Sequence, residues 1–371
     1  MSMQSFTIPQ HGGDIYTQEI LWDFSINVNP LGPPSRVKAA VRQSAEHCVC
    51  YPDPHCRELT AAIAAYYHVE KEDILCGNGA ADLLYQLVFA LIPRHAIIPV
   101  PTFTEYAHAL GAVKARITPV ILTKENGFAI TADAIKQQIL IQKNKGNPPD
   151  ILCLCNPNNP TGLPVSRADL LDLAEFTKKQ SIIFLLDECF TDFLDTPGDY
   201  SLLSDLNAFP NLIILKAFTK IYGMPGLRLG FFLTKNHTVL EKIRAVRQPW
   251  SVSTPAQMAG VAALQEGAYL KKTRQIIAQG RIQLSQGLTS LGFLVYPSKA
   301  NYLFFQDLRK DAKDAALYYA CLSQKLLLRS CANYPGLDSS YYRVCIKTEP
   351  ENTRLFYLLQ EVLETASAMN R

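Results

Sequence analysis

Several residues with chemically useful side chains follow short apolar runs in the middle of the chain. Asp187 ends the run IIFLLD, and Lys216 follows the run LIIL. A carboxylate at the end of an apolar run is costly to bury unless a cation or a hydrogen-bond donor faces it. We interpret Asp187 as a partner for a protonated heterocyclic nitrogen such as a pyridinium. A helix cap or an ordinary salt bridge is the alternative.

The segment KAFTK closes the next apolar run and ends at Lys220. Thr219 stands beside this lysine, and Arg228 follows eight residues after it. A lysine, a hydroxyl and an arginine in this order have the makings of a Schiff-base and phosphate site. We predict that Lys220 is the reactive lysine, because Lys216 lacks that spacing to Arg228. A surface turn with incidental charges is the alternative.

The glycine-rich segment GNGAAD, residues 77–82, follows a short apolar run and opens a helical pattern. A turn into a helix N-terminus presents free N–H groups and the positive end of the helix dipole, which suits a phosphate. The segment also resembles the start of a dinucleotide-binding fingerprint, but Asp82 stands where the third glycine belongs. An Asn-Gly turn without a ligand is the alternative.

The segment NPNNPTG, residues 156–162, is rich in turn-forming residues. Its two prolines stiffen it, so the amide of Asn159 can be held against a ligand with little loss of conformational freedom. An ordinary loop explains the same composition.

These residues need elements that position them, and the chain alternates short apolar runs with helical patterns. Runs that are apolar throughout indicate strands covered on both faces, and strand–helix alternation indicates a mostly parallel α/β sheet. Ligands bind at the carboxyl ends of such strands. The predicted strands are 96–100, 150–155, 182–187, 212–217 and 229–233, and the predicted helices are 80–91, 131–142 and 167–179.

The pattern changes after Trp250 to that of a second, α+β unit. A long helical pattern runs from Thr254 to about Leu291, and we expect a break near Gly280. Short strands at 301–305, 326–329 and 342–346 and closing helices follow.

Composition limits the class of protein. The chain has 371 residues and a formal net charge of +3, and its basic residues run no longer than pairs, so we expect no nucleic-acid partner. The N-terminus lacks the pattern of a secretory signal, and no apolar run approaches the roughly 18–20 residues that span a bilayer. We therefore expect a soluble, cytoplasmic protein. The ten cysteines lack zinc-site spacing, so we expect reduced thiols and no metal site.

Taken in order, GNGAAD, PTFTEY, NPNNPTG, DE, T-K and GLRLG, followed by a late arginine, resemble the fold-type-I pyridoxal-phosphate enzymes related to aminotransferases. The resemblance covers almost the whole chain. It implies an N-terminal arm (1–36) that packs with a small C-terminal α+β domain (255–371). Between them lies a large cofactor-binding domain (37–254) with a mostly parallel sheet between helices.

The resemblance also implies roles for individual residues. Lys220 would bind pyridoxal phosphate covalently, Asp187 would keep its ring nitrogen protonated, Asn159 would bond its O3′ atom, and Phe103 would stack on the ring. The cofactor phosphate would be held by Ala80, Ala81, Thr219 and Arg228, with Tyr51 reaching it from the other subunit of a homodimer. For the substrate, Arg343 would bind the α-carboxylate. His11, Gly12, Asn27, Asn159 and Arg329 would contact the rest, including a phosphate.

Two positions depart from the pattern of many aminotransferases. Phe190 stands where a tyrosine usually donates a hydrogen bond to the cofactor's O3′ atom, and Ala217 replaces a serine that adds a hydroxyl to the phosphate site. The first departure implies different electronic tuning. The second implies the loss of one neutral hydrogen bond, about 1 kcal/mol.

Other segments point to one branch of this family. HGG (11–13), DFSINVNPLG, YPDP, DECFTDF, QPWSV and RSCANYPGLDSSYYRV resemble the branch that decarboxylates L-threonine O-3-phosphate for cobalamin biosynthesis. Its N-terminal arm is expected to fold over the substrate. An aminotransferase, such as one acting on histidinol phosphate, is the alternative and would need a 2-oxo acid. A non-catalytic regulator that binds pyridoxal phosphate or a nucleotide is another, but it would not need Lys220.

Overall fold

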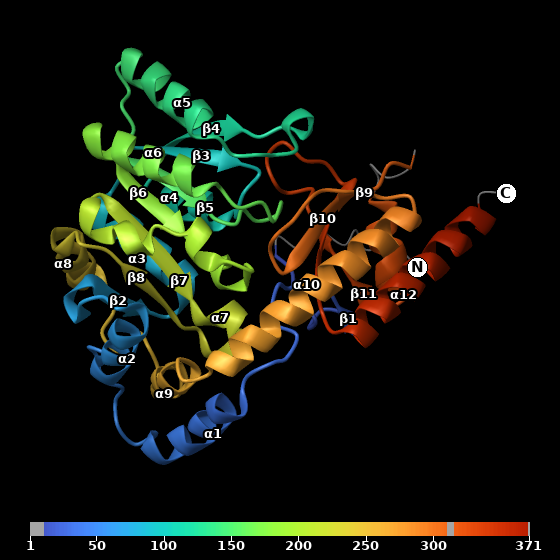
Figure 1. Ribbon diagram of the computed structural model, residues 1–371, viewed down its shortest axis with the longest axis horizontal. Helices are drawn as coiled ribbons and strands as arrows, with labels where there is room; N and C mark the ends of the chain where they lie inside the picture. The colour runs from blue at the N-terminus through green and yellow to red at the C-terminus, as the bar shows by residue number, and fades with distance from the viewer. Residues whose placement is uncertain (1–10, 310–314, 370–371) are drawn as a thin grey trace.

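The computed structural model describes residues 11–309 and 315–369, the last four without their side chains. A seven-stranded sheet forms its larger half (Figure 1). Five neighbouring strands are parallel, and β8 runs antiparallel to β2 and β7, which confirms a mostly parallel sheet. In spatial order the strands are β2 (Ile74–Gly77), β8 (Gly230–Leu233), β7 (Leu212–Ala217), β6 (Ile183–Asp187), β5 (Ile151–Cys155), β3 (His95–Val100) and β4 (Arg116–Ile121).

Helices cover both faces of this sheet (Figure 1). On one face α5 (Ala132–Asn144) packs against α6 (Arg167–Lys179), and on the other α3 (Gly79–Leu91) packs against α4 (Glu105–Ala112) and α8 (His237–Val246). This division follows from right-handed crossovers, because the chain reverses its direction along the sheet after β4. The central strands are therefore buried on both faces, which explains their continuous apolar sequences.

The smaller half contains the second sheet and the long helix α10 (Gly267–Ser290) (Figure 1). Its four strands are antiparallel. They are β12 (Arg329–Ser330), β13 (Tyr341–Cys345), β10 (Tyr302–Gln306) and β9 (Leu294–Val295). Helices α11 (Ala316–Ser323) and α12 (Glu349–Met369) complete this half.

The segment near the N-terminus lies against the smaller half. Strand β1 (Trp22–Asp23) pairs in parallel with β11 (Leu326–Leu327), and the N–H of Cys345 donates to the carbonyl of Phe24. Helices α1 (Ser35–Gln43) and α2 (Arg57–Tyr67) then contact α9 (Thr254–Ala263). The chain thus connects the two halves twice, once before α1 and once through α9. The predicted boundaries at 36 and 254 stay predictions.

Four details differ from the sequence analysis. The long helical pattern is interrupted between Ala263 and Gly267, not at Gly280. Gly280 lies inside α10, where the lack of a side chain allows close packing. A β-carbon on this residue would stand 2.6 Å from Cγ2 of Ile346. The predicted strand at 326–329 is divided between two sheets, and a single long helix closes the described chain. Edge strand β4 was not predicted.

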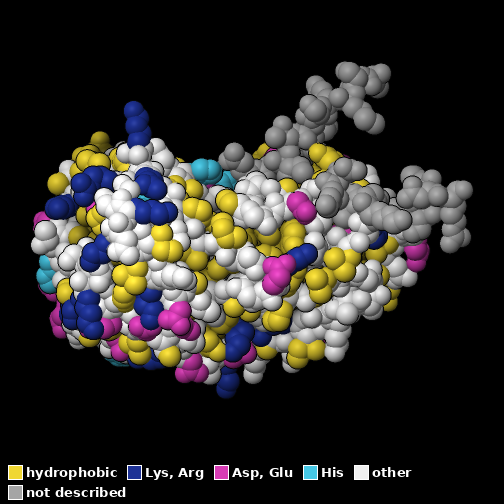
Figure 2. Space-filling model, turned by 90° about the horizontal axis from the view of Figure 1, so that it is seen from above, with side chains coloured by type: hydrophobic (Ala, Val, Ile, Leu, Met, Phe, Trp, Pro, Cys, Tyr) yellow, Lys and Arg dark blue, Asp and Glu magenta, His cyan; other side chains and the backbone are white. Residues whose placement is uncertain are grey.

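Charged side chains are mixed on the face shown in Figure 2, where Lys and Arg lie among acidic and apolar groups without forming one continuous patch. None of the helices within the described ranges is both long enough and apolar enough to cross a membrane.

Candidate active site

The cleft that collects the predicted residues lies at the carboxyl ends of β5, β6 and β7. These ends are in register, since Cys155 pairs with Asp187 and Asp187 with Leu215. Every predicted site residue except Tyr51 lines this cleft, from the N-terminal segment to β13. Its charged lining is four basic groups and one carboxylate, besides a histidine. These are Lys220, Arg228, Arg329, Arg343, Asp187 and His11.

Asp187 is buried at the end of β6, and its carboxylate is held from two sides. The hydroxyl of Tyr106 donates a 2.6 Å hydrogen bond to Oδ2, and the N–H of Cys189 donates one of 2.9 Å to Oδ1. Burial raises the pKa of Asp187, and these hydrogen bonds partly oppose the rise. A cationic ring nitrogen facing this carboxylate would relieve the desolvation, as the predicted role requires.

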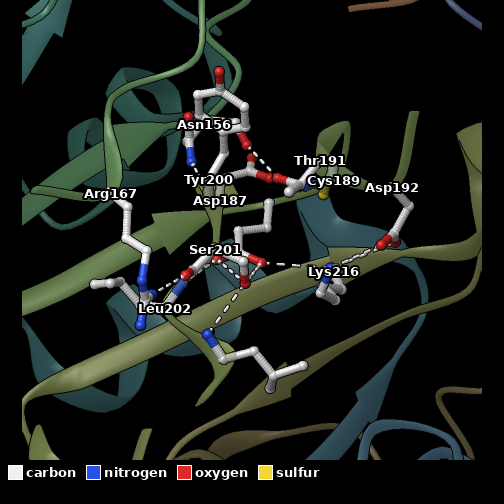
Figure 3. Close-up of polar contacts among 12 residues, drawn as sticks. Asn156, Arg167, Asp187, Cys189, Thr191, Asp192, Tyr200, Ser201, Leu202 and Lys216 are labelled. Atoms are coloured by element: carbon white, nitrogen blue, oxygen red, sulfur yellow. Dashed lines mark hydrogen bonds and ion pairs between the residues drawn. The ribbon is translucent and has the colours of Figure 1, made fainter. Parts of the chain in front are cut away.

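The two candidate lysines have opposite environments. Lys216 is buried between two carboxylates, with Nζ 3.4 Å from Oε2 of Glu188 and 3.3 Å from Oδ1 of Asp192 (Figure 3). Burial opposes its charge, but the carboxylates prevail and raise the pKa of Lys216. Ser201 in turn donates to Glu188. Lys216 is therefore a protonated structural group, whereas a nucleophilic amine must be neutral.

Lys220 lies in the short helix α7 (Phe218–Ile221), directly after β7, and lines the cleft. Burial lowers its pKa to about 8, and the positive charges of Arg343 and Arg228 contribute to the shift. Its backbone carbonyl accepts a 3.0 Å hydrogen bond from the N–H of Asn29. The Asn29 amide also donates to the carbonyl of Ile221 and to Oγ1 of Thr273. The N-terminal segment thus holds the lysine turn in place.

The residues that we predict to hold the cofactor phosphate meet where α3 begins. Gly79 has φ +85°, and a β-carbon on it would stand 2.7 Å from Nη2 of Arg228. The glycine therefore lets the guanidinium reach the N-terminus of α3, and Ala80, Ala81 and Thr219 line the cleft beside it. Asp82 does not hinder this site, because its carboxylate accepts from the backbone N–H of Asn78. Asp82 therefore stabilises the turn at Asn78, which explains its place in GNGAAD.

Arg329 and Arg343 are direct cross-strand partners on β12 and β13. Arg343 donates to Oδ1 of Asn159 at 2.5 Å and to the carbonyl of Ser25 at 2.6 Å. Within the described ranges, Nε of Arg343 and both amide atoms of Asn27 are buried without a hydrogen-bond partner. Buried polar atoms normally have partners, so these mark a place for a polar ligand.

Arg329 is buried and held by its own loop. Nη2 donates to Oδ1 of Asn333 at 2.7 Å, and the guanidinium lies 5.1 Å from the ring centroid of Tyr334. Both contacts fix the orientation of the guanidinium, which suits the bidentate recognition of an oxyanion.

The first described residues lie at the mouth of the cleft. His11 lines it, but Nε2 points to Glu105, 3.0 Å from Oε1. A β-carbon on Gly12 would stand 2.5 Å from the carbonyl oxygen of Ser25, and the N–H of Gly13 donates to the Ser25 hydroxyl. Gly12 therefore lets the arm pack closely on Ser25, and Gly13 has a positive φ of +87°.

The aromatic and loop residues of the site lie on its walls. Phe103 lines the cleft with its ring edge-on to that of Tyr106, and Asn159 faces Arg343. Phe190 also lines the cleft, and its ring centroid lies 5.2 Å from that of Tyr302. The Tyr302 hydroxyl donates to the carbonyl of Asn158, so it does not replace the hydroxyl that Phe190 lacks. Ala217 lines the cleft as well.

Tyr51 lies outside this cleft. Its side chain is 80% exposed and stacks on Trp250, with 4.7 Å between ring centroids. A role toward the site of a second subunit stays a prediction.

Sequence reasoning did not assign Tyr106, Ser25 or Tyr334. Tyr106 belongs to PTFTEY, a motif that it singled out without giving this tyrosine a role. Ser25 belongs to DFSINVNPLG, and Tyr334 follows Arg329 by five residues. Motif position alone does not reveal a hydrogen bond across the fold.

Comparisons with known proteins agree with this geometry. A family model described as aminotransferase class I and II matches residues 19–358. A threonine-phosphate decarboxylase of Salmonella typhimurium is 37% identical over 364 residues, 95% of this chain and 96% of the relative. A histidinol-phosphate aminotransferase of Anaeromyxobacter sp. is 32% identical, covering 91% of this chain and 89% of the relative. The crystal structure of a histidinol-phosphate aminotransferase from Clostridium acetobutylicum has a TM-score of 0.84 at 26% identity and covers 93% of this chain and 100% of that chain.

Proposed function

The chain belongs to the aminotransferase class I and II family, whose members of this kind use pyridoxal phosphate, and we propose that it decarboxylates L-threonine O-3-phosphate. The products are CO2 and (R)-1-aminopropan-2-yl phosphate, a precursor for cobalamin. The similarity to a threonine-phosphate decarboxylase over 95% of the chain supports this substrate.

One observation carries the proposal beyond similarity. Arg329 and Arg343 face each other across two strands, although like charges at such positions destabilise a sheet. A ligand with two anionic groups removes this penalty. L-Threonine O-3-phosphate has two, an α-carboxylate for Arg343 and a phosphate for Arg329. Lys220 and Arg228 remain for the cofactor.

The residues present fit pyridoxal phosphate. Gly79 leaves room for Arg228 at the N-terminus of α3, so the cofactor phosphate has a site there. When bound, the cofactor withdraws the electrons released by breaking a bond at the substrate's Cα atom. Asp187 holds a proton at the ring nitrogen, and Lys220 supplies the amine that binds the cofactor.

Substrate orientation selects the bond that breaks. With its two anionic ends held by Arg343 and Arg329, the substrate cannot rotate freely about Cα. In this proposal the two arginines would hold the carboxylate in the one orientation in which its bond to Cα can be cleaved. The segment around Gly12 covers the cleft mouth and limits the access of water.

The chemical test is incubation of the pyridoxal-phosphate-loaded protein with L-threonine O-3-phosphate, measuring CO2 with and without 2-oxoglutarate. Release of CO2 without the 2-oxo acid supports the proposal. Consumption of the amino group only when the 2-oxo acid is present would make the protein an aminotransferase. An aminotransferase is the second candidate because the chain is also similar to histidinol-phosphate aminotransferases, at a lower identity of 32%.

We also propose a cytoplasmic homodimer with shared sites and the division into arm, large and small domains at 36 and 254. The exposed pair Tyr51 and Trp250, beside the 92% exposed Val49, supports the dimer, because such apolar groups gather at interfaces. Light scattering of the purified protein gives its mass. A monomer at micromolar concentration would refute the shared site.

A further inference from the structure

Three potential metal ligands meet beside the cleft mouth. Nε2 of His11 and Nδ1 of His108 lie 3.0 Å and 2.9 Å from the same carboxylate oxygen, Oε1 of Glu105. All three ligand atoms lie within 4.8 Å of one another. His11 comes from the N-terminal arm, whereas Glu105 and His108 come from one turn of α4.

The chemistry of this set is that of a divalent transition-metal site. Two imidazoles and one carboxylate form a common zinc ligand set that leaves a fourth position open. Ligands of a tetrahedral ion with bonds of about 2.0–2.1 Å lie roughly 3.3 Å apart. The two distances to Glu105 are close to this value, and the two imidazole nitrogens, at most 4.8 Å apart, would have to turn toward a common centre. The spacing Glu-x-x-His on one helix also turns both side chains to the same side.

The cluster lies where an ion from solution is able to reach it. The side chains of His11 and His108 are 52% and 44% exposed, while Glu105 is 15% exposed and held between them. The ring centroid of His11 lies 6.5 Å from that of Phe103, which lines the cleft. An ion bound here would contact solvent and would also hold His11, which lines the cleft.

We propose that His11, Glu105 and His108 bind a divalent transition-metal ion, with Zn²⁺ as the natural occupant. The ion fastens the N-terminal arm to α4, a connection that the sequence spacing does not reveal. It also engages the imidazole of His11, so that this side chain is no longer able to contact a substrate phosphate. The metal site is the first part of this inference. The second part, which rests on the proposed function, is that Zn²⁺ inhibits decarboxylation.

Binding is tested with Co²⁺, whose visible absorption reports coordination by protein ligands. The parent protein carries Cys48→Ser and Cys50→Ser, because these two exposed thiols could bind the metal themselves. Full-length, pyridoxal-phosphate-loaded protein is titrated alongside His108→Ala and the control His47→Ala, which removes an exposed histidine elsewhere. We expect the parent and His47→Ala to bind one Co²⁺ per chain with the same Kd. In His108→Ala we expect a Kd higher by about tenfold or more.

Equal Co²⁺ affinity in the parent and His108→Ala would overturn the site and leave the three side chains as a hydrogen-bonded cluster only. Inhibition is tested separately as the ratio of CO2 release with and without Zn²⁺ in each protein. A ratio that falls in the parent and His47→Ala but not in His108→Ala supports the second part. Co²⁺ binding without this difference would refute the inhibition while the site stands. Absence of CO2 release from every protein would count against the proposed function, not against the site.

Discussion

The hydroxyl of Tyr106, in the first turn of α4, donates a 2.6 Å hydrogen bond to the buried carboxylate of Asp187 at the end of β6. Both groups are almost completely buried. Hydrogen bonds to charged groups in such surroundings contribute about 1.5–3 kcal/mol. This bond favours the ionised form of Asp187, on which the proposed chemistry depends.

The substitution Tyr106→Phe removes this hydrogen bond and should therefore raise the pKa of Asp187. We expect kcat to fall about tenfold or more. Covalent attachment of the cofactor to Lys220 should persist, because the lysine is untouched. The measurements are kcat for CO2 release and the pH dependence of the cofactor's visible absorption. Tyr357→Phe, at an exposed position, is the control. Normal kcat and an unchanged spectrum would leave Tyr106 with a packing role only.

Borohydride reduction of the loaded protein and peptide mapping should place the pyridoxyl label on Lys220. Lys216→Met should instead destabilise the fold by about 3–5 kcal/mol, because it leaves the Glu188 carboxylate buried without its cation. Chemical denaturation measures that loss. A label on Lys216 contradicts the assignment.

Cofactor uptake should depend on pH. Because the pKa of Lys220 is lowered to about 8, its amine is protonated below that pH and neutral above it. The rate at which the apoprotein takes up pyridoxal phosphate should rise with pH and have its midpoint near the same value. Arg343→Gln removes a neighbouring positive charge and should move the midpoint upward. A midpoint that stays fixed in this variant would show that another group controls uptake.

Gly79→Ala should weaken cofactor binding about tenfold or more, which corresponds to at least 1.4 kcal/mol. The added methyl group would collide with Arg228, and the residue has a positive φ that alanine adopts only with strain. Equilibrium dialysis measures the Kd for pyridoxal phosphate. Gly111→Ala is a matched control, because a β-carbon there meets no atom within 4 Å. Similar Kd values for both variants would exclude this glycine as part of the phosphate site.

Arg329→Lys should raise KM for L-threonine O-3-phosphate about tenfold, since an ammonium cannot reproduce two parallel hydrogen bonds to a phosphate. Any turnover of L-threonine, which lacks the phosphate, should change much less. Steady-state CO2 release with both substrates gives the comparison. A loss of equal size for both would indicate that Arg329 supports the loop or the carboxylate site.

Local sequence patterns predicted most of the elements that form the site. Asp187 ends β6, and Lys220 and Arg228 both lie in the connection that follows β7, so the rule for strand ends brings them together. Continuous apolar runs revealed β5, β6 and β7 because both faces of these strands are covered. Edge strand β4 has one exposed face and a weaker pattern, which the sequence analysis passed over.

Contacts between distant segments account for what was missed. Tyr106 and Asp187 are 81 positions apart, and no spacing rule connects them. Gly280 suggested a break in a helix, but its neighbour Ile346, which directly follows β13, requires the glycine for packing. Likewise, the meeting of His11 with Glu105 depends on how the arm crosses the cleft.

Asn29 limits how the two halves of the molecule could rotate against each other. Its three hydrogen bonds tie the N-terminal segment, the lysine turn and α10 together at one point. A rigid-body rotation of the smaller half must break these bonds or turn about this point. In the second case displacement would grow with distance from Asn29, and Lys220, whose carbonyl accepts one of these hydrogen bonds, would keep its position.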